Sequence, residues 1–169
     1  MADKYLYNNQ GTITEKAATV VSTGVNEAGK IVALDSTGKL DNSVLPVGVG
    51  PDTKILPAAE ALGAGDFVNI FNDAGTVKVR KADATTAGKE ANGFVLSAVT
   101  AGADATVYFE GTNNQLSGLT GGTVYFLSTT AGGVTSTAPS SSGNIVQKIG
   151  RALSATEINV EFSDPIVLA

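Results

Sequence analysis

Residues 67–80 read Phe67-Val68-Asn69-Ile70-Phe71-Asn72-Asp73-Ala74-Gly75-Thr76-Val77-Lys78-Val79-Arg80. Two runs rich in β-branched and aromatic residues flank the turn-forming segment 72–75, a combination that is typical of a β-hairpin. In the second run Val77 and Val79 alternate with polar residues, as expected for a strand with one buried face. This stretch predicts antiparallel β structure, and the segments that follow it show similar patterns.

Similar short apolar runs follow to the end of the chain, and most of them come directly after glycine or asparagine. The predicted strands cover residues 94–99, 105–109, 123–127, 134–136, 145–149 and 158–162. Short strands at this spacing are typical of small barrels and sandwiches. We therefore expect an all-β protein whose body, residues 58–169, is a small β-barrel or β-sandwich.

The first 57 residues differ from this body and predict an extended N-terminal arm. Extended pieces are expected around Tyr5–Tyr7 and residues 12–14, and a short strand over Ile31–Leu34 is closed by a turn at residues 35–38. Three prolines with two intervening glycines punctuate residues 46–57, where a helix or central strand cannot easily continue. We expect the arm, residues 1–57, to end there.

Composition argues against several classes of function. The 169 residues include no His, Cys or Trp, so the commonest general base, metal ligand and thiolate nucleophile are missing. The net charge is −5 and the 11 basic residues are scattered, which disfavours nucleic-acid binding. No apolar run is long enough for a membrane helix or a secretory leader. We expect a structural protein that is not an enzyme and needs no cofactor or metal.

Carboxylates are the acid/base groups that remain, so a glycosidase is the enzyme to weigh. The candidate acids are Asp66, Asp73, Asp104, Glu110, Glu157 and Glu161. No two of them are singled out by spacing, and Asp66, Asp73 and Asp104 occupy turn positions that favour aspartate for backbone reasons. We interpret them as structural.

Two tyrosines sit between apolar neighbours in predicted strands. Tyr108 lies between Val107 and Phe109, and Tyr125 lies between Val124 and Phe126. Each should point to the face opposite its neighbours. Either they are exposed and mark an interface, or they fill a second packed face of the same body.

Three segments resemble bacteriophage virion proteins. They are Lys30–Pro46, which contains the sequence LDSTGKLDNSVLP, Gly65–Ile70 and Ile145–Leu153. The chain resembles the family of phage capsid decoration (cement) and head-fibre proteins. The resemblance implies a homotrimer on the outer surface of the capsid, where it binds neighbouring major capsid subunits and stabilises their lattice.

The arm would supply the anchor. Its apolar residues that we expect to contact the capsid or the trimer core are Tyr5, Tyr7, Ile31, Leu34, Leu40, Val44 and Leu45, because extended arms bind through backbone pairing and side-chain pockets. The competing interpretation is that they extend the core of the body. An alternative function is a receptor- or carbohydrate-binding module of a head or tail fibre, in which Asn113, Asn114 and Tyr108 would contact host-surface glycans.

Overall fold

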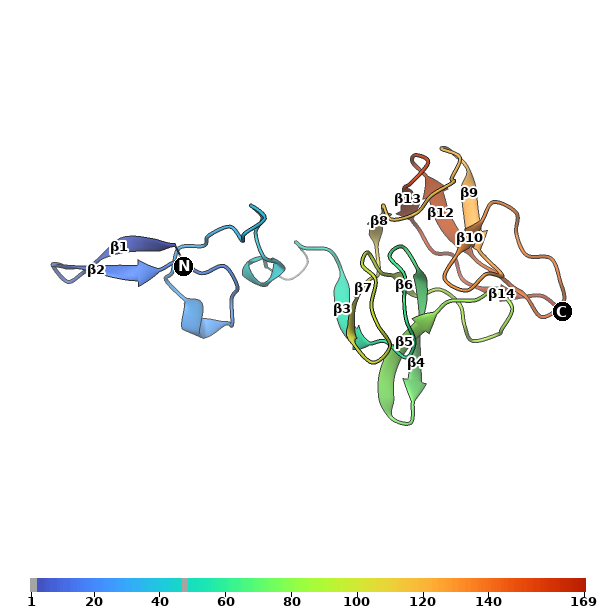
Figure 1. Ribbon diagram of the computed structural model, residues 1–169, viewed down its shortest axis with the longest axis horizontal. Coiled ribbons are helices and arrows are strands. Elements are labelled where there is room, and N and C mark those ends of the chain that lie inside the picture. Colours follow the sequence, from blue (N-terminus) through green and yellow to red (C-terminus); the bar gives the residue numbers. More distant parts are fainter. Residues whose placement is uncertain (1–2, 47–48) are drawn as a thin grey trace. The chain divides into compact units, whose positions relative to one another are not determined.

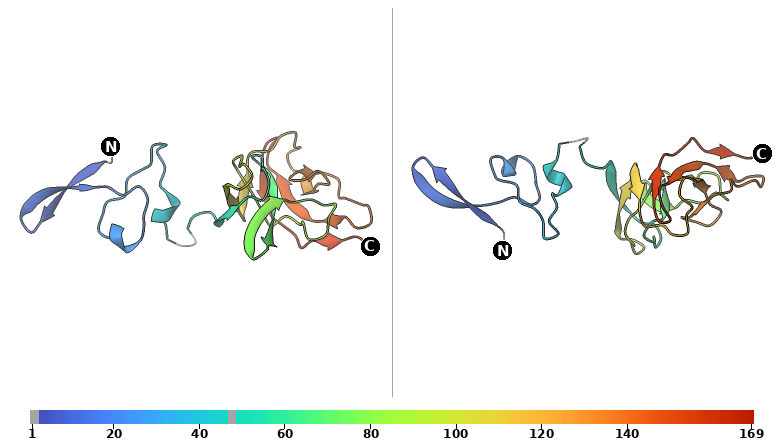
Figure 2. Two further views of the ribbon diagram at one scale, coloured as in Figure 1. Left: turned by 60° about the horizontal axis from the view of Figure 1, so that its bottom comes forward. Right: turned by 90° about the horizontal axis from the view of Figure 1, so that it is seen from above.

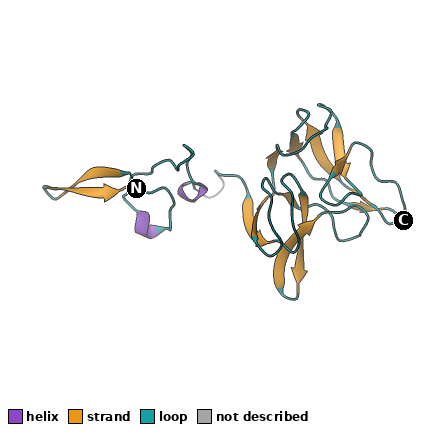
Figure 3. Ribbon diagram, in the orientation of Figure 1, coloured by secondary structure: helices purple, strands orange, loops and turns teal. Residues whose placement is uncertain are grey.

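The computed structural model describes residues 3–46 and 49–169, and its strands are joined by antiparallel ladders (Figures 1 and 3). The all-β expectation is confirmed. The chain divides into two compact units, Met1–Gly50 and Pro51–Ala169, which we call the N-terminal unit and the body. The division lies before the expected boundary at residue 57, because strand β3 (Thr53–Pro57) pairs along its whole length with a strand of the body.

The N-terminal unit begins with a hairpin of β1 (Lys4–Asn9) and β2 (Thr12–Ala17). Its two-residue turn places Gln10 and Gly11 at φ angles of 50° and 94°, the left-handed geometry that tight hairpins require. No third strand among the described residues joins this pair, as both views in Figure 2 show. The hairpin is a free two-stranded ribbon, which is marginally stable by itself in water.

The rest of this unit is mostly loop. It contains two single-turn 3₁₀ helices, η1 (Val25–Glu27) and η2 (Asn42–Val44). The strand expected over Ile31–Leu34 is wrong, because in the described chain this segment makes only an isolated bridge between Val32 and Thr19. Apolar β-branched residues favour a strand, but a ladder also needs a neighbouring strand, and none is provided here.

One five-stranded sheet of the body follows the order β3-β7-β6-β4-β5. Its remaining strands are β4 (Phe67–Asp73), β5 (Thr76–Lys81), β6 (Gly93–Phe94) and β7 (Asp104–Tyr108). The hairpin expected at residues 67–80 is confirmed as β4–β5, with Ala74 and Gly75 at φ angles of 51° and 93° in its turn. A bridge between Ala58 and Val79 brings the chain after β3 to β5, so the sheet curves strongly.

The second five-stranded sheet follows the order β10-β9-β12-β13-β8. Its strands are β8 (Gly111–Asn113), β9 (Val124–Leu127), β10 (Val134–Thr135), β12 (Lys148–Ala152) and β13 (Ile158–Val160). A separate short pair joins β11 (Ile145–Val146) to β14 (Ile166–Val167). The sheets of the body pack together in a sandwich-like arrangement.

Two apolar clusters form the core of the body, and adjacent residues of β4 supply both. Phe67 is fully buried with residues of β9, β12 and β13, so its cluster lies between the two sheets. Val68 points the other way and packs with residues of β3, β5 and β7. Successive side chains of a strand face opposite sides, and here both sides are buried. Every residue of both clusters belongs to the body.

Two predicted strands are interrupted, and others end one or two residues earlier than expected, such as β13 at Val160. Beyond Phe94 the expected 94–99 strand leaves its neighbour, and Val99 instead pairs with Leu62. The expected 145–149 strand is divided into β11 and β12 at Gln147, whose buried side chain bonds to the backbone of Ala91. In both places a tertiary contact replaces a ladder that local sequence favours.

Candidate binding surface

The N-terminal unit exposes its large apolar side chains. Ten of them are exposed: Leu6, Tyr7, Ile13, Val21, Val25, Ile31, Val32, Leu34, Leu40 and Val49. Among the described residues of the unit only Thr19, a polar residue, is buried. Single exposed apolar residues are ordinary, but so many in 50 residues without a core are typical of a segment that is buried against a partner.

Leu6 and Ile13 occupy one face of the free hairpin. Leu6 lies opposite Glu15 and Ile13 opposite Asn8, so the two apolar side chains are diagonal neighbours across the strands. They are 73% and 60% exposed. The Lys4 ammonium lies 2.6 Å from the Glu15 carboxylate on the same face. This face therefore offers a small apolar surface beside an exposed ion pair.

The opposite face of the hairpin carries Tyr5 and Tyr7. The Lys16 ammonium lies 4.5 Å from the centre of the Tyr7 ring, within the range of a cation–π contact. Tyr5 is half-buried, and its hydroxyl donates to the carbonyl of Gly29 at 3.4 Å. Tyr5 thus connects the hairpin to the following loop, whereas Tyr7 remains exposed.

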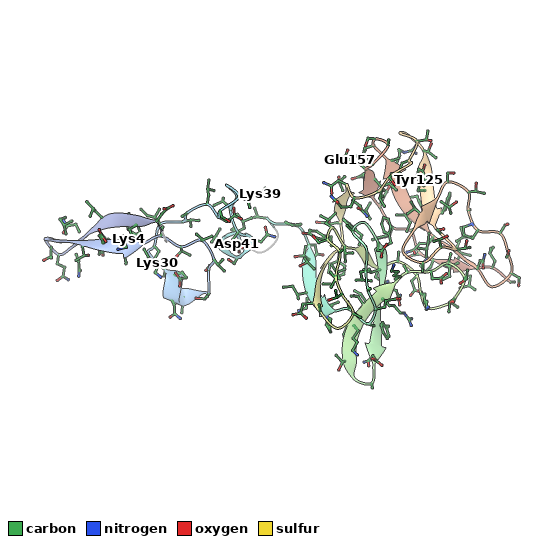
Figure 4. The ribbon with its side chains drawn as sticks, viewed as in Figure 1. Lys4, Lys30, Lys39, Asp41, Tyr125 and Glu157 are labelled. Carbon is green, nitrogen blue, oxygen red and sulfur yellow. The ribbon has the colours of Figure 1, made fainter. Side chains whose placement is uncertain are left out.

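Glu27 stabilises the loop that contains η1 through polar contacts. Its carboxylate accepts hydrogen bonds from the Thr19 hydroxyl at 2.6 Å and the Thr23 hydroxyl at 3.3 Å, and it pairs with Lys30 at 2.6 Å. The Lys30 hydrogen bond, followed by that of Thr19, lowers the pKa of Glu27. Lys30 is labelled in Figure 4. Polar contacts therefore hold this loop in place of an apolar core.

Polar contacts also shape the Lys30–Pro46 segment. The Asp35 carboxylate accepts from the backbone N–H groups of Thr37 and Lys39 at 2.8 and 3.0 Å, and the Lys39 bond is the first cause of its lowered pKa. Gly38 has φ 78° and donates to the Asp35 carbonyl, which confirms the expected turn. This turn separates two exposed apolar residues, Leu34 and Leu40.

Asp41 begins the next element in the same way. Its carboxylate caps η2 by accepting from the Ser43 N–H at 2.9 Å, and hydrogen bonds from Ser43 lower the pKa of Asp41. Asp41 and Lys39 are labelled in Figure 4. The two aspartates give the Lys30–Pro46 segment a defined backbone although it buries almost nothing.

The predicted anchor residues all fall in the N-terminal unit, and none belongs to the core of the body. Ile31, Leu34, Leu40 and Tyr7 are exposed, whereas the remaining three are half-buried: Tyr5, Val44 and Leu45. The interpretation that these residues extend the core of the body stays a prediction, although neither core cluster includes any of them. Whether they contact a capsid or a trimer partner stays a prediction.

Sequence reasoning missed other exposed apolar residues of this unit, above all Leu6, Ile13, Val21 and Val25. Val25 is 87% exposed. Leu6 and Ile13 could have been found, because they alternate with polar residues on either side of a predicted turn. No comparable pattern marks Val21, Val25 or the role of Glu27.

The two strand tyrosines of the body differ in burial. Tyr125 is only 7% exposed, belongs to the cluster between the sheets, and accepts a hydrogen bond from the Thr120 N–H at 2.9 Å (Figure 4). Tyr108 is half-buried, and its ring stacks on that of Phe94 with centroids 5.6 Å apart. The second packed face is therefore correct for Tyr125, and exposure as an interface residue is wrong for it.

Of the residues named for glycan contact, Asn113 is structural. It is fully buried, its amide donates to the carbonyl of Gly65 at 2.8 Å, and its oxygen accepts from the Gln115 N–H. Asn114 is exposed, and its oxygen accepts from the Gln115 side chain. Asn113 cannot reach a ligand without breaking its contacts with the loop before β4.

Half of the six candidate acids of the body form ion pairs with lysines. Three ion pairs involve them: Asp66 with Lys81 at 3.1 Å, Asp73 with Lys78 at 2.8 Å, and Glu161 with Lys148 at 2.8 Å. Within residues 3–46 and 49–169, no cluster of three or more acidic side chains is placed to hold a metal ion. In the same residues no helix has the length and apolarity to cross a membrane.

No protein-family model matches the chain, and no curated protein sequence matches it.

Proposed function

We propose that the chain is a structural virion protein that decorates the outside of a phage capsid, with the N-terminal unit bound to major capsid subunits and the body displayed. The observation that carries the proposal is the contrast between the two units. The body has its own buried core, whereas the N-terminal unit exposes ten large apolar side chains and buries none among its described residues. The resemblance of Lys30–Pro46 to virion segments supplies the class of partner.

Apolar contact would dominate the binding. Residues 1–50 contain four lysines and five acidic residues, a net charge of −1, while the whole chain has −5. Long-range attraction to a charged partner is therefore weak for this unit. Fully burying a side chain such as Leu6 or Ile13 is worth about 1.5–3 kcal/mol, and both have most of their surface left to bury.

The free hairpin offers a second mode of contact. Both outer edges of β1 and β2 lack a neighbouring strand in the described chain. Such edges pair readily with a strand of another chain, and backbone hydrogen bonds then add to the side-chain contacts. A capsid strand that completed this sheet would also stabilise the hairpin itself.

Copy number and multivalency would convert modest contacts into stabilisation of the capsid. A protein that binds only the assembled lattice stabilises it by mass action. In a homotrimer, docking of one N-terminal unit raises the effective concentration of the other two. This mechanism requires no catalytic group.

Removal of residues 1–50 tests the proposal. The truncated protein, residues 51–169, retains both core clusters, so we expect it to fold with an unchanged melting temperature but to lose co-sedimentation with empty, expanded capsids of the phage that carries the gene. Light scattering of the full chain should give three times 17.0 kDa. The proposal would be refuted if the truncated protein bound capsids as well as the full chain does, or if the full chain were monomeric and did not bind capsids.

A double substitution sharpens the test. Leu6→Ser with Ile13→Ser should weaken capsid binding at least about tenfold, since each 1.4 kcal/mol corresponds to a factor of ten, without changing the stability of the body. The matched control is Ile166→Ser with Val167→Ser, two similarly exposed apolar residues of the body (62% and 54%). Equal effects of the two pairs would contradict a specific role for the hairpin.

A further inference from the structure

A cleft opens in the first sheet of the body beside β7. The ladder between β6 and β7 contains the single pair Phe94–Tyr108 within the described chain. Beyond Phe94 the chain turns to the segment before β4, with Val95 donating to the carbonyl of Asp66 and Val99 paired with Leu62. The departing chain leaves a cleft of about 250 Å³ along β7.

Polar side chains from both walls line this cleft. Asp104, Thr106 and Tyr108 share one face of β7, because they alternate with the buried residues of the strand, and Ser97 lies on the opposite wall. Among the described residues, none of these four side chains has a hydrogen-bond or ion-pair partner, in contrast to the paired acids elsewhere in the body. Three hydroxyls and one carboxylate at the cleft are therefore available to bind a ligand.

Apolar surface accompanies these groups. Leu96 lines the cleft and packs against the cluster between the sheets, and Val99 lines it from the second cluster. The Tyr108 ring is held in place by its stacking on Phe94. The combination of a fixed aromatic ring, aliphatic walls and free hydroxyl and carboxylate groups suits a ligand that has both C–H surfaces and many hydroxyls.

We propose that this cleft binds one neutral pyranose unit of a glycan. Hydroxyls of the sugar donate to the Asp104 carboxylate and accept from Thr106 and Ser97, while a C–H surface of the ring lies against Tyr108 or Leu96. The volume is below the about 300–1,000 Å³ of typical small-molecule pockets, which matches a single ring. The Asp104 carboxylate disfavours acidic sugars and phosphates by charge repulsion.

This inference is independent of capsid decoration. It rests on residues 94–108 of the body. The body can therefore bind glycans even if the N-terminal unit binds no capsid, and the N-terminal unit can bind a capsid even if the body binds no glycan. Failure of one proposal leaves the other standing. The site also differs from the glycan residues expected from sequence, since Asn113 is buried and Asn114 does not line the cleft.

The test is an NMR titration of the full-length, ¹⁵N-labelled protein with the methyl pyranosides of glucose, galactose and mannose in turn. We expect saturable shifts of the amides of residues 96–99 and 104–108 with at least one sugar, with millimolar affinity (about −4 kcal/mol). Absence of saturable shifts in these residues for all three sugars, up to ~100 mM, about a hundred times that dissociation constant, would overturn the proposal.

Two variants separate binding in the cleft from general effects. Asp104→Asn should weaken the titrated affinity at least about tenfold, as expected for hydrogen bonds to a charged group, and Thr106→Val should weaken it less. Both residues are exposed, so the fold should be retained, which the spectrum itself reports. The control Asp164→Asn removes another exposed carboxylate of the body. Equal affinity of Asp104→Asn and Asp164→Asn would also overturn the proposal.

Discussion

Replacement of Gln147 by leucine is expected to destabilise the body strongly although the two side chains are similar in size. Gln147 is 2% exposed and lies between β11 and β12. Its oxygen accepts from the Ala91 N–H at 2.8 Å, and its amide donates to the carbonyls of Ala91 at 3.0 Å and Ser163 at 3.2 Å. One side chain thereby joins three segments that are distant in sequence.

The magnitude follows from what leucine leaves behind. The Ala91 N–H loses its acceptor in a buried position, which costs about 1–3 kcal/mol. The two carbonyls also lose a donor, each at about 0.5–1.5 kcal/mol. Leucine recovers part of this through apolar burial, so we expect a net loss of about 2–4 kcal/mol. For a chain of this size that corresponds to a decrease of roughly 5–15 °C in melting temperature.

Urea unfolding followed by circular dichroism measures this change, with the melting temperature as a second readout. The matched control is Gln115→Leu, the same substitution at an exposed glutamine whose amide donates to the neighbouring Asn114 side chain. Its effect should stay within about 0.5 kcal/mol. A loss below about 1 kcal/mol for Gln147→Leu, or equal losses for both variants, would refute the reasoning that this network holds the divided strand.

Two further perturbations have clear expected outcomes. The hydrogen bond from Lys30 lowers the pKa of Glu27 below its ordinary 4.5, and the Lys39 N–H lowers that of Asp35 below 3.8. The contacts of these carboxylates are therefore complete above those values and are lost as the pH falls through the lowered pKa values. Amide protection factors in the N-terminal unit, which are corrected for the intrinsic pH dependence of exchange, should decrease only in acid, and a loss of protection near pH 7 would contradict this. In thermal unfolding, Gly132→Ala should destabilise the body by more than Gly75→Ala. Both glycines have positive φ angles, but of these two only Gly132 would bring the new methyl group against a side chain, 2.7 Å from the Asp66 carboxylate. Equal losses of stability would contradict this prediction, because they would show that the clash is relieved.

Local sequence was sufficient wherever a segment carries its own partner. The hairpin at residues 67–80 has alternating strands and a turn that requires positive φ angles, so its register follows from the chain itself. The turn at Asp35–Gly38 was predictable for the same reason, since the aspartate side chain and the glycine backbone act within four residues. Three of the predicted anchor residues, Ile31, Leu34 and Leu40, are exposed, but whether they bind a partner stays a prediction.

Where the partner lies far along the chain, sequence could not decide. Tyr108 and Tyr125 occupy equivalent positions between apolar neighbours, yet the second is buried because another sheet covers it. The segment Ile31–Leu34 has the composition of a strand and is none, because no strand lies alongside. The cleft at β7 exists only because the chain beyond Phe94 leaves the sheet for Leu62.

The sequence by itself determined that this protein is all-β, that its first part differs from the rest, and that histidine and cysteine are missing, because composition, alternation and turn chemistry are local properties. The tertiary structure decided where the units divide, which apolar residues remain exposed and which polar groups gather at one cleft. Burial depends on what the rest of the chain places against a residue, and that sum over distant contacts cannot be read from neighbours in sequence.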